Sequence, residues 1–99
     1  MKGKRHILSL VILFSIAFLQ AQNTAIPDAN FENYLETHAQ DGSVVAIGDA
    51  SSMGDGMANN GLVFTSRISN VMLLNVNNLN ISDLTGIEDF TALETLICN

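Results

Sequence analysis

The last third of the chain repeats a pattern of apolar residues at a spacing of 22. Val71, Leu74 and Val76 are matched, 22 residues later, by Leu93, Leu96 and Cys98. A period of this size is typical of repeat architectures, in which each unit adds one short strand to a stacked solenoid. We therefore predict an α/β repeat fold, with an N-terminal capping helix and short strands leading into a solenoid. About one and a half repeats of that solenoid would be present.

We expect residues 71–92 to form the first repeat unit and residues 93–99 to begin a second, truncated one. Three apolar residues at a spacing of three, 84, 87 and 90, predict a helical or 3₁₀ return limb. Stacked units must place apolar side chains at equivalent positions, so that neighbours share one core. The predicted core positions are Val71, Leu74, Val76, Ile81, Leu84, Ile87, Phe90, Leu93, Leu96 and Cys98.

Residues 1–21 have the pattern of a secretory signal peptide. A basic start with Lys2, Lys4 and Arg5 precedes an apolar run over residues 7–19. The alternative is a transmembrane helix, which needs about 20 apolar residues, and this run is shorter. We predict cleavage after Ala21, no membrane span in the mature chain, and a secreted or cell-surface protein.

The mature segment, residues 22–99, is strongly acidic. Arg67 is its one Arg or Lys, against ten Asp or Glu, hence a formal charge of −9. Such a module repels phosphate backbones, so nucleic acid is excluded as a partner. The chain has one cysteine, Cys98, and therefore no internal disulfide. Because two repeat strands bury little surface, we expect this to be the N-terminal piece of a longer protein or a truncated gene product.

Residues 22–70 are expected to form a capping region with an amphipathic helix near residues 27–38. Asp28 suits the helix start, because its side chain can accept free N–H groups. Glu32 and Glu36 fall on the side predicted to face solvent. The apolar face has helical spacing and comprises Phe31, Tyr34, Leu35 and His38.

The sequence of the rest of the capping region predicts little regular secondary structure. Residues 22–25 are expected to be a flexible lead, residues 43–47 a short strand, and the Gly-, Ser- and Asn-rich residues 48–61 a loop. This loop can be compared with a calcium loop, since Asp49, Gly54 and Asp55 fall at suitable offsets. Met53, however, stands where an oxygen ligand is needed, and Asn60 replaces the bidentate Glu of such loops. We therefore predict a surface loop with no metal or cofactor.

Together these motifs resemble a known family. Residues 71–99, above all the segment from Ile81 to Ile87, resemble the 22-residue, internalin-type class of bacterial leucine-rich repeat. The run from Ile26 to Phe31 and the Gly54-Asp55-Gly56 loop are similar to the N-terminal region of secreted leucine-rich repeat proteins of Flavobacterium-like bacteria. The resemblance implies a capped, right-handed leucine-rich repeat solenoid with a parallel sheet on its concave face. Leu79 departs from the polar residue common at its position.

No catalytic residue is predicted. His38 and Cys98 are interpreted as packing residues, and the carboxylates as turn and surface residues. The predicted function is a non-catalytic extracellular protein-interaction module, whose partner is a protein or surface glycan bound through downstream repeats. The alternatives are an accessory region of a secreted enzyme such as a hydrolase, and a gene fragment without independent function. The predicted concave-face residues are Met72, Leu73, Asn75, Asn77, Glu94, Thr95 and Ile97.

Overall fold

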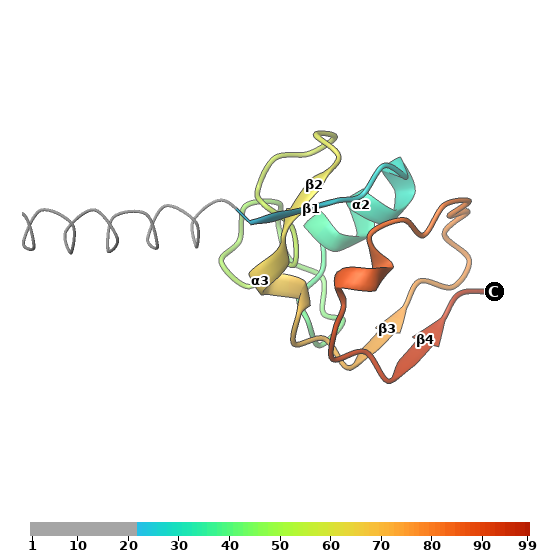
Figure 1. Ribbon diagram of the computed structural model, residues 1–99. Helices are drawn as coiled ribbons and strands as arrows, with labels where there is room; N and C mark the ends of the chain where they lie inside the picture. The colour runs from blue at the N-terminus through green and yellow to red at the C-terminus, as the bar shows by residue number, and fades with distance from the viewer. Residues whose placement is uncertain (1–21) are drawn as a thin grey trace, which may run out of the picture.

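The fold is seen in a computed structural model that describes residues 22–99 (Figure 1). The predicted signal peptide, residues 1–21, lies outside the described residues. Within residues 22–99, no helix is both long and apolar enough to cross a membrane. The elements in chain order are β1 (Asn23–Ala25), α2 (Ala29–Glu36), β2 (Leu62–Phe64), α3 (Thr65–Ile68), β3 (Leu73–Asn75), the 3₁₀ turn η1 (Ile87–Asp89) and β4 (Thr95–Ile97).

Strand β1 ties the start of the described chain to its middle. It pairs antiparallel with β2, with Thr24 opposite Val63. The Thr24 hydroxyl lies 2.7 Å from that of Thr65 and donates to Asp89 in η1 over 2.8 Å. The prediction of a flexible lead over residues 22–25 is therefore wrong, because backbone pairing and these part-buried hydrogen bonds fix the segment.

Helix α2 is the helix expected near residues 27–38, and it is shorter at both ends. Asp28 caps its N-terminus, accepting the N–H groups of Asn30 and Phe31 at 3.0 Å each. Such a cap contributes about 1 kcal/mol. At the other end the Thr37 hydroxyl donates to the carbonyl of Asn33 at 2.8 Å.

Within residues 22–99, one apolar core is shared by the N-terminal and C-terminal parts. The ring of Phe31 on α2 stacks on that of Phe90, with centroids 6.1 Å apart and planes 17° from parallel. Around this pair lie the remaining buried members of the cluster, which are Ile26, Leu35, Met53, Val63, Ile68, Val71, Leu74 and Val76.

Strands β3 and β4 pair in parallel, side by side at the C-terminal end of the molecule (Figure 1). The register places Leu73 opposite Thr95, Leu74 opposite Leu96 and Asn75 opposite Ile97. Each pair is 22 residues apart, so the sequence period corresponds to the register of this one strand pair. The connection between the strands passes through η1.

The predicted repeat solenoid is nevertheless wrong. Residues 22–99 form a small unit with two helices and two separate two-stranded sheets, β1–β2 and β3–β4. The physical reason lies in the packing, because the apolar residues of 71–93 cover the N-terminal half rather than a second coil. Phe90 on Phe31 is the central contact of that arrangement.

Residues 43–47 do not form the predicted strand. Val44 makes one isolated bridge to His38, and its side chain is exposed. A strand needs a neighbour along its length to satisfy its main-chain groups. Here Asp41 draws Ser43 into a tight turn, so the segment follows the loop instead.

Candidate functional site

The outward face of the β3–β4 sheet carries the residues predicted to form the binding surface. Leu73 and Asn75 on β3 lie opposite Thr95 and Ile97 on β4. The side chains of Met72 and Leu73 are 60% and 55% exposed. Asn75, Glu94 and Thr95 are also exposed, whereas Asn77 and Ile97 are half-buried. Four of the predicted residues thus lie on one sheet, and Met72, Asn77 and Glu94 lie just beyond the ends of its strands.

The predicted core positions separate into three groups. Val71, Leu74, Val76 and Phe90 are fully buried. A second group is partly buried and packs against the core, and it comprises Ile81, Leu84, Ile87, Leu93 and Leu96. Cys98 is exposed, so its assignment to the core is wrong. It follows the end of β4, and no element of the described chain covers it.

Glu32 and Glu36 are buried in the structure, contrary to the solvent-facing position expected from the sequence. The carboxylate of Glu36 accepts the N–H groups of Asp55 and Gly56, each at 3.0 Å. One helical turn earlier, Glu32 accepts those of residues 60 and 61 at 3.1 and 3.0 Å. The two carboxylates hold the loop against α2.

Burial raises the pKa of Glu36 above its ordinary value of 4.5. The main-chain donors of Asp55 and Gly56 act in the opposite direction, because they stabilise the ionised form. The group therefore has the raised pKa that accompanies some catalytic acids. Both its oxygens, however, are engaged by the loop, so its hydrogen bonds are structural.

Asp28 connects α2 to the loop before η1. One of its oxygens caps the helix, while the other accepts the N–H groups of Ser82 and Asp83 at 2.9 and 3.1 Å. The N–H of Phe31, together with those of Ser82 and Asp83, holds the pKa of Asp28 below its ordinary value of 3.8. The Asp28 side chain thus hydrogen-bonds both the first turn of α2 and the loop before η1, which are about 50 residues apart in the sequence.

Three further aspartates make the same local turn. In each case one carboxylate oxygen accepts both the N–H and the hydroxyl of the Ser or Thr two residues later, at 2.6–2.9 Å. These hydrogen bonds lower the pKa of all three aspartates. The pairs are Asp41 with Ser43, Asp49 with Ser51, and Asp83 with Thr85.

The loop compared with a calcium site uses its acidic groups to fold itself. Asp49 bonds Ser51, and Asp55 accepts the N–H of Met57 and the side-chain amide of Asn60. Among residues 22–99, no three His, Cys, Asp or Glu side chains are grouped to share a metal ion. The carboxylates point to their own loop rather than to a common centre.

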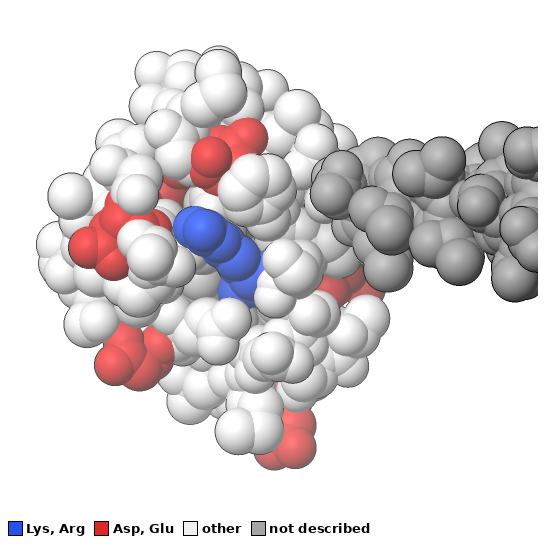
Figure 2. All heavy atoms as spheres, turned by 90° about the vertical axis from the view of Figure 1, so that its left-hand side faces the viewer, with Lys and Arg blue, Asp and Glu red and all other residues white. Residues whose placement is uncertain are grey.

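Arg67 is the one Arg or Lys of residues 22–99, and it stabilises the same loop. Its guanidinium donates to the carbonyls of Ser52 and Gly54 at 3.2 and 3.3 Å and lies 5.3 Å from the centre of the Phe64 ring. Figure 2 shows it near the middle of one face, with acidic side chains around it. The face remains acidic overall.

His38 is half-buried and hydrogen-bonded, as predicted for a capping histidine. Its Nδ1 lies 2.9 Å from the carbonyl oxygen of Tyr34, and the two rings stack with centroids 3.9 Å apart. The same Nδ1 lies 3.1 Å from the Thr37 hydroxyl, which itself donates to the carbonyl of Asn33, so these contacts tie the ring to the end of α2.

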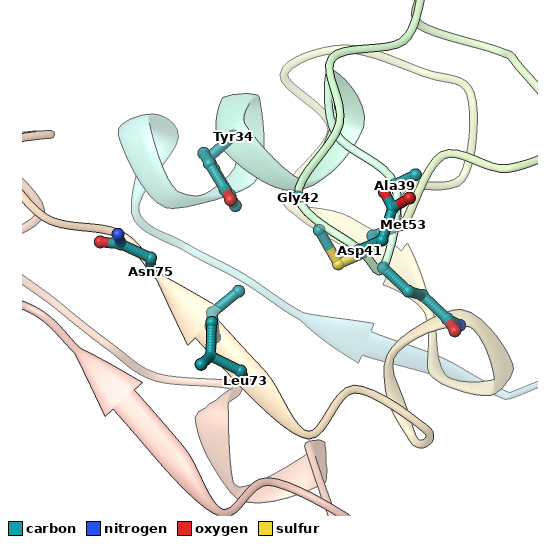
Figure 3. Close-up of a pocket in the computed structure, with 9 residues that line it drawn as sticks. Tyr34, Ala39, Asp41, Gly42, Met53, Leu73 and Asn75 are labelled. Carbon is teal, nitrogen blue, oxygen red and sulfur yellow. The ribbon is translucent and has the colours of Figure 1, made fainter.

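A cavity of about 300 Å³ lies between α2, the loop after it and β3 (Figure 3). Tyr34 contributes from the helix, Asp41 and Gly42 from the loop, and Leu73 and Asn75 from the strand. The sequence does not predict this cavity. The residues named on its helix-and-loop wall are 30 or more positions from those on the strand, and the spacing of apolar residues does not show which distant segments come together.

No protein-family model, no curated protein and no solved structure matches this chain. The resemblance to secreted leucine-rich repeat proteins therefore stays a prediction, and function is argued from the residues themselves.

Proposed function

We propose that this chain is a non-catalytic extracellular module that binds a partner protein through the outward face of β3 and β4. The observation that carries the proposal is the exposure of Leu73, at the start of β3, and of Met72, the residue before it. Exposed neighbouring apolar side chains are typical of interaction sites. Across the sheet, Leu73 lies opposite the uncharged Thr95, and Asn75 lies opposite Ile97.

The distribution of acidic side chains supports a non-catalytic role. The carboxylates of Asp28, Glu32 and Glu36 each accept two or more main-chain N–H groups. A catalytic acid or base must instead reach the proton of a substrate. These groups hold loops in place, which is the task of a scaffold.

Export is part of the proposal and rests on residues 1–21. The test is N-terminal sequencing of the protein recovered from the culture medium, for which we expect a start at Gln22. Full-length protein retained in the cells would contradict it.

The binding face can be tested by site-specific photo-cross-linking of the full chain in its native host. A cross-linking amino acid at Thr95 should give one discrete protein adduct, and the matched control at the loop residue Met57, which is 64% exposed, should not. The same adduct must disappear with Leu73→Asp and persist with Met57→Asp. Equal adducts from both positions would contradict the proposal.

A further inference from the structure

Strand β3 has two edges, and only one of them is paired with β4. The carbonyl of Met72 accepts from Thr95, and the N–H of Val76 donates to Ile97. Along a strand, alternate residues direct their main-chain groups to opposite edges. The N–H and C=O groups of Leu73 and Asn75 therefore point away from β4, and within residues 22–99 they make no hydrogen bond.

This unpaired edge faces a groove rather than a covering strand. The cavity of about 300 Å³ between Tyr34 and β3 is lined by Leu73 and Asn75 (Figure 3). A second cavity of about 360 Å³ is also lined by Asp41 and Leu73, so the two adjoin beside the strand. Volumes of this size are at the lower end of those that hold ligands.

The negative charge around the groove indicates the charge of the segment that it would bind. Residues 22–99 carry ten acidic groups and one basic one, and Asp41 lies in the wall of both cavities. Arg67 is engaged by three loop carbonyls away from β3. A positively charged segment is attracted to this wall, whereas an acidic one, including a second copy of this chain, is repelled.

We propose that the groove binds an extended basic peptide segment of a partner protein, which adds to the free edge of β3 as a third strand. The main chain of the segment pairs with Leu73 and Asn75, and its side chains alternate between the cavity beside Tyr34 and solvent. Strand addition of this kind obtains affinity from main-chain hydrogen bonds and specificity from side-chain pockets. The proposal rests on the proposed function and names its partner chemistry.

The test uses a fluorescein-labelled hexapeptide of alternating Lys and Val, and fluorescence anisotropy with the mature protein at low salt. We expect saturable binding that weakens as salt is added. A Glu-Val peptide of equal length should not bind. A Lys-Val peptide that is N-methylated at every residue should also fail, because it keeps the charge and loses the main-chain donors.

Two protein variants locate the peptide. Leu73→Pro removes an N–H that faces the groove and leaves the hydrogen bonds to β4 in place, whereas Leu73→Ala keeps that N–H. We expect the proline variant to raise the Kd about fivefold or more relative to the alanine variant, as the loss of one hydrogen bond implies. Asp41→Asn keeps the turn acceptor and removes the charge, so it should weaken binding at low salt only.

The outcomes separate this inference from the proposed function. Binding that survives Leu73→Pro and full N-methylation but is lost with Thr95→Asp would place the peptide on the outward face, which overturns the groove and supports the module. Equal binding of the Glu-Val peptide, or no binding at all, would overturn the groove as a basic-peptide site. The cross-linking result at Thr95 stands independently of each of these.

Discussion

Gly54 lies so close to the carboxyl group of Glu36 that a β-carbon built on the glycine would overlap it. The N–H groups of the next two residues, Asp55 and Gly56, are the donors that bind this carboxylate. The close approach of glycine thus lets the loop backbone reach a buried charge. The contact between the loop and Glu36 therefore explains both why this carboxylate is buried and why position 54 is a glycine.

Gly54→Ala should destabilise the protein by about 1–3 kcal/mol, because the added methyl group displaces the carboxylate or the loop. Chemical denaturation followed by circular dichroism measures the change. In a Glu36→Ala background the methyl group meets no carboxyl, so the same substitution should cost much less. An equal cost in both backgrounds would mean that the contact is not the reason.

Glu36→Gln and Glu32→Gln should each lower the free energy of unfolding by about 1.5–3 kcal/mol, since an amide NH₂ then opposes a main-chain N–H. Glu94→Gln is the matched control. Glu94 is exposed and its side chain makes no hydrogen bond in the described residues, so we expect a change within about 0.5 kcal/mol. Indistinguishable stabilities for the three variants would show that the buried carboxylates do not hold the loop.

Asp28 and Glu36 should affect acid stability in opposite directions. The pKa of Asp28 is lowered in the folded state, so its contribution is present above its ordinary pKa of 3.8 and is lost as the pH falls below it. The pKa of Glu36 is raised, so protonation favours the fold, and that gain is lost as the pH rises through the folded pKa.

The melting temperature should therefore fall less steeply between pH 6 and 3 in Asp28→Asn than in the wild type, and more steeply in Glu36→Gln. Thermal melts at each pH, followed by circular dichroism, measure both slopes. Parallel curves for all three proteins would remove these two groups as the source of the pH dependence.

Cys98 should react with a thiol reagent in the folded protein at a rate within a few-fold of that in urea, because its side chain is exposed. The chain has one cysteine, so the absorbance of the released thiolate reports on this residue alone. Protection by orders of magnitude in the folded state would restore the core position expected from the sequence.

The sequence predicted local features better than their assembly. The cap at Asp28 and the helical spacing of Phe31 and Leu35 are properties of neighbouring residues, and the structure has both. Burial of Glu32 and Glu36 depends on donors 19 to 29 residues away, which no periodicity reveals. The one available sequence indication was an acidic pair at i and i+4 before a glycine-rich loop.

The 22-residue period is the clearest example of a correct pattern with a wrong extension. It corresponds to the register between Leu74 and Leu96. The same apolar residues can cover a second coil or the N-terminal half, and spacing does not distinguish the two. The stacking of Phe90 on Phe31 decides between them.

Phe90→Ala should therefore destabilise the whole described unit, by about 3–5 kcal/mol, rather than its C-terminal third alone. Tyr34 is the one tyrosine, the chain has no tryptophan, and its ring lies on α2, so its fluorescence reports on the N-terminal half. We expect the fluorescence and circular dichroism transitions to shift together in urea. Phe90→Leu, which retains most of the volume, should shift both transitions less and serves if the alanine variant does not fold. A Tyr34 transition that stays in place while the circular dichroism changes would mean that the two parts have separate cores.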